Sequence, residues 1–390
     1  RGLGDVYKRQ VVNWTLEDAG SEELRTWVLG ALIQMTTLMV QEERSHLAQM
    51  NAIGELCAQF SRGALAVIRS LGADDAIHLV ESYHRLHPAA SGAAWHPDAL
   101  ARLDSPEWQQ LYVNAEHDGL VGVISIGRES YNRDVDSELN RAIDWLLTER
   151  IDRVIVTGDF HLAGQMVGAD TREFFAALDD EEHGVEISCD WSATARRLHR
   201  DFDTSVGLIV GKRCLGGMLE LMMHCHYLVA VEDAAIGMPE VTLPVVPGME
   251  GCHWPFRRAT AEHWPRLLGM LLEGRLVQAA DTIGWLVDYA GTLDDVLQIA
   301  WRVASGAEHG IRRRAIDEDA LDMRSVDVPY LKGIASQEGR RAILDTVRAA
   351  CGATLAEALE VQARHSGGFM TGDACRGGVI GTAARKTMAV

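Results

Sequence analysis

Apolar runs of strand length that alternate with helical segments are the feature that most constrains the fold of this chain. They begin after Asp118-Gly119 and cover Leu120–Ile126, Arg153–Thr157, Val206–Val210 and Tyr227–Val231. Helical patterns separate them, and a clear one runs from Asp136 to Leu147. Strands that alternate with helices form crossover units, so this part of the chain is predicted to be a sheet covered by helices, in the α/β class.

The residues before this region show a helical pattern instead. Apolar side chains such as Val28, Leu32 and Met35 recur three and four residues apart. A third helix is predicted over Asp74–His84, ahead of Pro88. We see no catalytic motif in this block. We therefore expect residues 11–115 to form an all-helical N-terminal extension with a structural or oligomeric role, residues 116–306 the core, and residues 307–390 a helical C-terminal region.

The charge and the cysteines of the chain restrict its partners and its compartment. The formal net charge is −19, and an acidic surface repels nucleic acid and anionic membranes, so we expect neither as a partner. The longest apolar stretch, Trp27–Val40, contains polar residues and is too short to span a bilayer. The seven cysteines are dispersed without a C-x-x-C pair, which favours free thiols in a reducing compartment and predicts a cytoplasmic protein.

Two glycine-containing turns that lead into predicted helices carry the chemical argument. The first is V-G-A-D-T-R-E-F at 167–174, and the second is C-L-G-G-M-L-E-L at 214–221, followed by G-M-P-E at 237–240 and P-G at 247–248. Small residues at such turns leave backbone N–H groups accessible at the start of a helix. Two such ends that converge would form an oxyanion hole, which is a pair of N–H donors for a carbonyl oxygen that gains charge.

In this order and spacing the motifs resemble those of the enoyl-CoA hydratase/isomerase (crotonase) superfamily. The resemblance covers roughly residues 118–306 and resumes at 359–378, where T-G-D-A-C-R-G at 371–377 is similar to a late family motif, with Arg376 in place of the usual Glu. Each short motif is common, but the ordered set is specific. The resemblance implies a crotonase-like spiral of ββα units for the core.

The resemblance also implies roles for individual residues. Glu220 and Glu240 stand where hydratases of the family carry two catalytic carboxylates, and the backbone N–H groups of Ala169 and Gly217 stand where the oxyanion hole holds the thioester carbonyl. Arg172 is implied to lie near the phosphates of coenzyme A. The other residues implied in substrate binding, including one whose N–H helps to hold the catalytic water, are Ser130, Tyr131, Asn132, Gly168, Asp170, Gly216 and Gly248.

Paired carboxylates suit the addition of water to a conjugated thioester. One carboxylate takes a proton from water and one acid protonates the α-carbon, and two carboxyls that lie close together share a proton because both cannot easily ionise. We therefore expect a lyase of fatty acid metabolism that converts a 2-enoyl-CoA to a 3-hydroxyacyl-CoA by syn hydration. The coenzyme A thioester is the substrate, no further cofactor or metal is expected, and the resemblance implies a homotrimer or homohexamer.

Departures from the family pattern leave other functions open. Met218 replaces a third glycine, His226 stands where Asp is usual, and Glu250 adds a third carboxylate near the site. Isomerisation of the double bond, hydrolysis of an acyl-CoA, and a catalytically silent partner that binds acyl-CoA or protein are the alternatives. The two glutamates favour the hydratase, because a silent partner needs neither. We expect His224 and His226 to pack rather than bind a metal, because an i, i+2 pair at a helix end does not converge on one ion.

Overall fold

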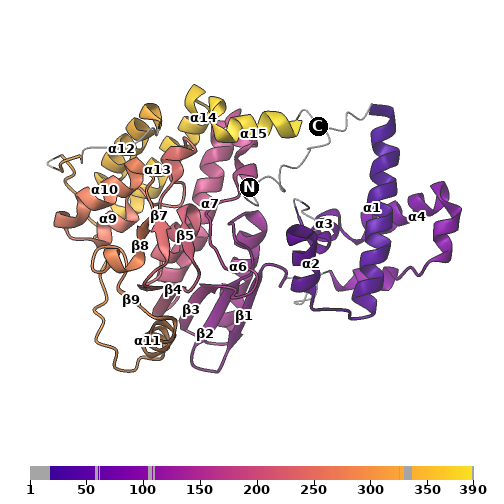
Figure 1. Ribbon diagram of the computed structural model, residues 1–390, viewed down its shortest axis with the longest axis horizontal. Helices are drawn as coiled ribbons and strands as arrows, with labels where there is room; N and C mark the ends of the chain where they lie inside the picture. The colour runs from indigo at the N-terminus through magenta and orange to yellow at the C-terminus, as the bar shows by residue number, and fades with distance from the viewer. Residues whose placement is uncertain are drawn as a thin grey trace, which may run out of the picture. The chain divides into compact units, whose positions relative to one another are not determined.

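A computed structural model describes residues 18–57, 60, 62–103, 108, 110–324, 326–328 and 336–388 (Figure 1). Within the predicted N-terminal extension, residues 11–17, 58–59, 61, 104–107 and 109 lie outside these ranges. The chain divides into two compact units, one of residues 1–108 with 383–390 and the other of residues 109–382. None of the helices in the described ranges is both long and apolar enough to cross a membrane.

The first unit is built from helices and short 3-10 turns. Its elements are α1 (Asp18–Gln41), α2 (Leu47–Leu56), α3 (Ala64–Leu71), α4 (Ala73–Leu86), η2 (Pro88–Gly92) and η3 (Pro97–Arg102). α1 packs along α4, with Ile33 and Val80 buried in the unit. The side-chain amide of Gln34 donates hydrogen bonds to the carbonyl oxygens of Ala90, Ala93 and Ala94 at 3.2–3.3 Å, which fixes η2 and the residues after it to α1.

A twisted sheet forms the centre of the second unit. Among the described residues it has six strands in the order β1 (Val113–His117), β2 (Gly122–Ile126), β3 (Arg153–Gly158), β4 (Thr204–Ile209), β6 (Tyr227–Val231) and β9 (Tyr289–Gly291). Only β1 is antiparallel to its neighbour, and the other pairs are parallel. All residues of β6 are buried, as is typical of a parallel sheet with both faces covered. The predicted α/β class is confirmed, and the four predicted strands correspond to β2, β3, β4 and β6.

The second unit also contains a smaller sheet, and its first strand is followed directly by α8 (Gly216–Met223). It consists of β5 (Arg213–Leu215), β7 (Ala235–Gly237) and β8 (Val277–Gln278). Between β2 and Thr242 the helices and turns are α6 (Arg133–Thr148), η4 (Thr171–Phe174), η5 (Ala176–Leu178), α7 (Glu181–Arg200), α8 and η6 (Glu240–Thr242). Because α8 follows β5 without a linker, the glycine pair at 216–217 lies at the junction of strand and helix.

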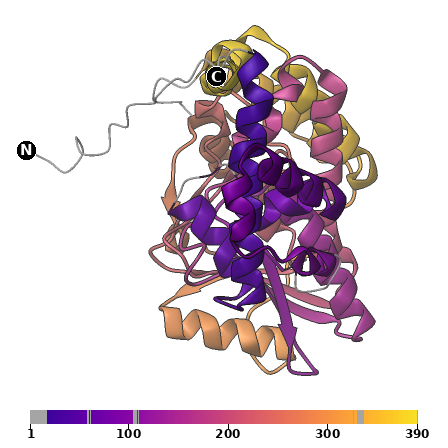
Figure 2. The same ribbon diagram turned by 90° about the vertical axis from the view of Figure 1, so that its right-hand side faces the viewer.

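Helices predominate in the last part of the chain. They are α9 (Trp254–Arg258), η7 (Ala261–His263), α10 (Trp264–Glu273), η8 (Ala279–Thr282), α11 (Leu293–Ser305), α12 (Gln337–Cys351), α13 (Leu355–Met370), α14 (Asp373–Gly377) and α15 (Val379–Met388). α11 packs on β3, β4 and β6 and is the orange helix at the lower edge of Figure 2. The predicted C-terminal helical region is present, but residues 307–324 come before it without helix or strand. α13 packs on α7.

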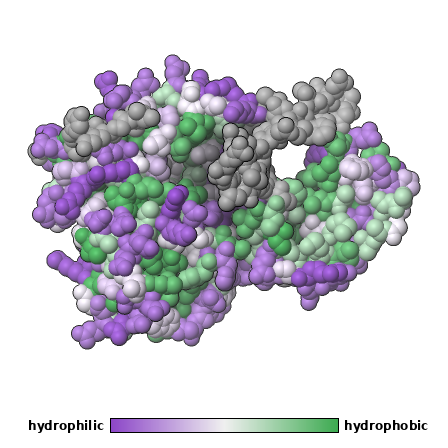
Figure 3. Space-filling model, in the orientation of Figure 1, coloured by the Kyte–Doolittle hydropathy of each residue, from purple (hydrophilic) through white to green (hydrophobic). Residues whose placement is uncertain are grey.

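Side chains on the visible face of the second unit are largely hydrophilic, with smaller apolar areas between them (Figure 3). Hydrophilic side chains therefore gather on this face, while every residue of β6 and α8 is buried. Every residue of α8 is buried, including Glu220. A carboxylate on such a helix needs polar partners, because burial of an unpaired charge is costly.

Candidate active site

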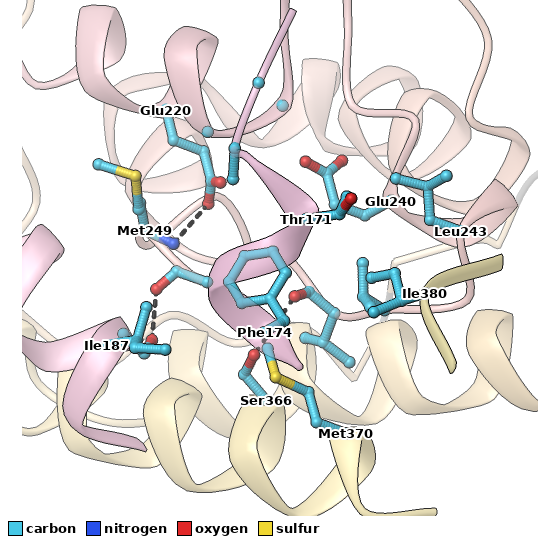
Figure 4. A pocket seen from close by; sticks show the side chains of 18 of the residues that line it. Thr171, Phe174, Ile187, Glu220, Glu240, Leu243, Met249, Ser366, Met370 and Ile380 are labelled. Atoms are coloured by element: carbon cyan, nitrogen blue, oxygen red, sulfur yellow. Dashed lines mark hydrogen bonds between the residues drawn. The ribbon is translucent and has the colours of Figure 1, made fainter. Parts of the chain in front are cut away.

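A cavity of about 70 Å³ lies in the second unit, between the start of α8 and the facing surfaces of α7 and α13. Glu220 and Glu240 occupy one part of its wall, and both appear in the upper half of Figure 4. Apolar side chains form much of the remaining wall, and Ile187 and Met370 appear in the lower half of that view. The further large apolar lining residues are Val167, Phe174, Trp191, Leu243, Val245, Val246, Met249 and Ile380.

Backbone pairing brings the two glycine turns together. The N–H of Leu215 donates to the carbonyl of Met166 at 2.8 Å, and the N–H of Met166 donates to the carbonyl of Arg213 at 2.9 Å. The loop that contains Ala169 therefore runs beside the start of α8. A β-carbon added at Gly217 would lie only 3.5 Å from the Ala169 nitrogen. The structure thus brings the two predicted oxyanion-hole residues next to each other.

The N–H groups of Ala169 and Gly217 are both available to a ligand. Within the described part of the chain, neither N–H donates a hydrogen bond to a protein acceptor. Gly217 is the second residue of α8, where a helix leaves its N–H groups without internal partners. Both residues line the cavity. Two converging N–H donors at a helix start can hold a carbonyl oxygen that becomes negative.

The carboxylate of Glu220 lies at the cavity wall, where backbone N–H groups hold it. Its Oε1 accepts hydrogen bonds from the N–H of Met249 at 2.9 Å and the N–H of Gly251 at 2.7 Å. Gly251 must be small, because a β-carbon there would lie 2.7 Å from this oxygen. Burial is the main cause that raises the pKa of Glu220, the charge of Glu240 raises it further, and the two N–H donors counteract both.

Glu240 begins η6, and burial raises its pKa as well. Among the described residues, no partner donates a hydrogen bond to its buried Oε2. Its Oε1 lies against Gly216, where a β-carbon would come within 2.5 Å and where φ is +50°. Glycine is therefore required at 216 both by the backbone and by the carboxylate. Two carboxyls whose pKa values are raised together favour a state with one proton and one negative charge.

Glu250, the third carboxylate expected near the site, follows the lining residue Met249 in sequence but does not itself line the cavity. It is fully buried and accepts a bidentate pair of hydrogen bonds from Arg196 at 2.7 and 2.6 Å. Burial alone would raise the pKa of Glu250, but its contacts with His224, His253 and Arg196 hold the pKa well below the usual range. The side chain is therefore a buried, paired anion outside the cavity lining.

The cavity brings together seven of the residues implied by the resemblance, namely Gly168, Ala169, Gly216, Gly217, Glu220, Glu240 and Gly248. The N–H of Gly248 has no acceptor among the described residues, while its carbonyl accepts from Ser188 and Ser192. The hydroxyl groups from α7 thus hold the turn at Gly248. Its N–H remains available to a water molecule in the cavity.

Five implied residues do not line the cavity, and three of them precede α6. Tyr131 is fully buried, and its hydroxyl donates to Asp136 at 2.7 Å. Asn132 caps α6, since its Oδ1 accepts from the N–H of Val135 at 2.9 Å. Ser130 is half-buried. The backbone of Tyr131 bonds to both Gly168 and Asp170, so this segment supports the loop that contains Ala169.

The other two residues outside the cavity, Asp170 and Arg172, form an ion pair. Arg172 donates to both oxygens of Asp170, with Nε–Oδ1 at 2.9 Å and Nη2–Oδ2 at 2.6 Å, and Arg128 reaches Oδ2 at 3.0 Å. Burial raises the pKa of Asp170, but the arginines more than offset it and hold the pKa below its usual value. Asp170 therefore orients Arg172, whose side chain is 43% exposed.

Several lining residues have no sequence motif that could have revealed them. Ile187, Ser188 and Trp191 come from α7, and Ser366 and Met370 come from α13. Their helical spacing indicates only a buried face. Of the two histidines, His224 contacts the backbone oxygen of Glu220 in its own helix, and His226 accepts from the N–H of Ser205 at 3.0 Å.

Comparison with known proteins complements this geometry. No family model matches the chain. Over 196 residues it is 29% identical to a probable enoyl-CoA hydratase of Mycobacterium bovis, which covers 49% of this chain and 72% of that protein. Over 201 residues it is 28% identical to a probable enoyl-CoA hydratase of Rhizobium meliloti, covering 49% and 74%. Among solved structures it is similar in fold to a carnitinyl-CoA dehydratase from Mycobacterium thermoresistibile, with a TM-score of 0.52. The sequence identity is 16%, and the match covers 71% of this chain and 89% of that chain.

Proposed function

Because the chain belongs to the crotonase superfamily, we propose that it is an enoyl-CoA hydratase. The substrate would be a 2-enoyl-CoA, and the product a 3-hydroxyacyl-CoA formed by syn addition of water. The observation that carries this proposal is the convergence of two buried carboxyls, Glu220 and Glu240, with two available N–H groups in one cavity. An isolated acyl-CoA binding site would gain nothing from a pair of buried carboxyls, because burying them is costly.

The proposed mechanism follows the charges. The N–H groups of Ala169 and Gly217 donate to the thioester oxygen, which becomes negative as the β-carbon is attacked. The ionised member of the carboxyl pair takes one proton of the water whose oxygen bonds to the β-carbon, and the protonated member gives its proton to the α-carbon. Water is thereby added in full, and the pair again holds one proton. Glu220 and Glu240 titrate as one unit, so the two roles belong to the pair.

Label from heavy-oxygen water distinguishes this proposal from its rivals. A hydratase places the label in the hydroxyl group on the β-carbon of the acyl-CoA, because that oxygen comes from the water. A hydrolase places it in the released acid, and an isomerase incorporates none. Mass spectrometry of the products from enoyl-CoA substrates of several chain lengths is the measurement. Label found only in free acid, or bound acyl-CoA with no turnover, would contradict the hydratase.

Arg172 is proposed to lie near the phosphates of coenzyme A, and Arg172→Gln is expected to raise KM about tenfold, the equivalent of one lost charged contact. The kcat is expected to change little, since a phosphate contact is similar in the ground and transition states. Steady-state kinetics measures both. Arg200→Gln is the matched control, because Arg200 is an exposed arginine that pairs in the same bidentate way with Asp201. A collapsed kcat with unchanged KM would exclude this placement.

We also propose that the helices of residues 11–115 serve assembly rather than chemistry. Leu24, Val28 and Met35 are exposed along α1 at helical spacing, which suits contact with another apolar surface. A homotrimer or homohexamer is the proposed assembly, on the strength of the family resemblance.

The cytoplasm is the proposed location, since the seven cysteines are free thiols and five of them are buried.

A further inference from the structure

The loop that binds Glu220 contains a residue in an unfavourable backbone conformation. Glu250 has φ of +71°, in the left-handed region that residues with a β-carbon adopt at a cost. Its two neighbours in sequence, Met249 and Gly251, supply the N–H groups that bond to Oε1 of Glu220. The turn at Glu250 therefore aims both N–H groups at one oxygen. A glycine would adopt this turn without strain. A residue with a side chain persists in such a conformation only where its surroundings stabilise it.

The side chain of Glu250 connects this loop to three other segments. Arg196 on α7 donates to both of its oxygens, and Nη2 of Arg196 also donates to the carbonyl of Leu355 at the start of α13, at 3.0 Å. His224, at the end of α8, places Nε2 3.3 Å from Oε1 of Glu250. His253 Nε2 lies 3.0 Å from Oε2, a close contact without the geometry of a hydrogen bond.

This cluster reaches Glu220 along two routes. The first passes through the backbone of Glu250 to the N–H groups of Met249 and Gly251. The second passes through His224, whose Nδ1 contacts the carbonyl of Glu220 at 2.8 Å, one turn earlier on α8. The bidentate ion pair is short and its carboxylate is fully buried, so it holds one geometry. Movement of the loop would therefore displace the carboxylate of Glu220.

We propose that Glu250, held by Arg196, is a positioning residue that fixes the loop at 248–253 so that Glu220 keeps its catalytic orientation. With Oε1 engaged by two N–H groups, Oε2 of Glu220 has no donor among the described residues and is left for the cavity. Glu250 itself is not among the residues that line the cavity. The inference rests on the proposed role of Glu220 and adds the element that orients it.

Glu250→Gln tests this role because it keeps the shape of the side chain and removes its charge. The kcat for hydration is expected to fall about 10–100-fold, since small misplacement of a catalytic group costs up to about 100-fold. The KM is expected to stay within about threefold, because the oxyanion hole and the acyl pocket are unchanged. Glu250→Gly also removes the ion pair, but it relieves the backbone strain. Compared with Glu250→Gln, it should therefore recover stability without recovering kcat.

Asp288→Asn is the matched control for the loss of a buried ion pair. The side chain of Asp288 is also buried and pairs with two arginines, Arg314 at 2.7 Å and Arg258 at 3.4 Å, but it does not line the cavity. This variant and Glu250→Gln are both expected to lower the melting temperature, but Asp288→Asn should keep kcat at the level of the unaltered protein. If Glu250→Gln lost stability yet kept kcat, or if Glu250→Gly restored full kcat, the ion pair would be merely structural and the proposal would be overturned.

A second readout does not depend on turnover. Carbon-13 NMR of labelled glutamate carboxyls, assigned with Glu220→Gln, follows the titration of Glu220 in the whole protein. The titratable groups that act on this carboxyl are Glu240, Glu250 and Cys252. Loss of the charge of Glu250 alone would lower the pKa of Glu220, because that charge raises it; loss of the two N–H bonds would raise the pKa, because they lower it.

The sign of the shift therefore decides the outcome. An upward shift of the pKa of Glu220 in Glu250→Gln, absent in Asp288→Asn, is the expected result, since the two N–H donors affect Glu220 more than the distant charge does. A downward shift or no shift would show that the loop had stayed in place and would overturn the proposal. If the unaltered protein failed to hydrate any enoyl-CoA, the proposed function would fall, while the NMR result would still report whether Glu250 orients Glu220.

Discussion

Replacement of Glu220 or Glu240 with glutamine is expected to lower kcat for hydration by about 10²–10⁴-fold, the range for removal of a positioned acid or base. Glutamine keeps the size of the side chain but neither accepts nor releases a proton at this step. The double replacement is expected to cost much less than the product of the two single losses, because the carboxyls act on the same water as one unit. Steady-state kinetics of the three variants measures both quantities.

A matched control separates loss of chemistry from loss of fold. Glu138 is also buried and accepts two backbone N–H bonds, from Tyr112 at 2.7 Å and Val113 at 2.9 Å, but it does not line the cavity. Glu138→Gln is expected to lower the melting temperature and to leave kcat nearly unchanged. A fully active Glu240→Gln enzyme would contradict paired catalysis and would favour the isomerase or hydrolase, in which a single carboxyl suffices.

Gly217→Pro is expected to lower kcat/KM by at least about 10²–10³-fold, the cost of one lost oxyanion-hole donor. Proline has no N–H, and its ring carbon takes the place of that hydrogen, so it also keeps the thioester oxygen away from the N–H of Ala169. The fold should tolerate the change, because Gly217 is in the first turn of α8, where proline is acceptable. Circular dichroism and melting curves check the fold, and kinetics checks the loss.

Gly217→Ala is the control for crowding at the same position. Its β-carbon would lie 3.4 Å from Sδ of Met249 and 3.5 Å from the nitrogen of Ala169, which are ordinary contacts, and its N–H is retained. A loss of less than about tenfold is expected for alanine. Equal losses for alanine and proline would mean that space, rather than the donor, matters at Gly217, and the oxyanion-hole assignment would then be withdrawn for this residue.

The elements of the core could be predicted from the sequence because their signals are local. A run such as Tyr227–Val231 has no polar residue to face water, so it is expected in a sheet covered on both faces, and β6 is buried throughout. The glycine pair at 216–217 and the glutamate at 220 lie within one turn of helix of each other, so their relative placement follows from helix geometry alone. The strand pattern also indicated the α/β class, which the structure confirms.

The side-chain environments depended on contacts between distant segments. Glu250 is paired with Arg196, which is 54 residues away in sequence, and the apolar wall includes Met370 from a helix near the end of the chain. Tyr131 and Arg172, by contrast, take partners that are close in sequence, Asp136 and Asp170. Periodicity reports which face of an element is buried, but not which side chain of another element meets it there. Packing decides which side chains pair and how they are oriented. The ion pair between Glu250 and Arg196, and the shape of the cavity, could therefore be found only from the tertiary structure.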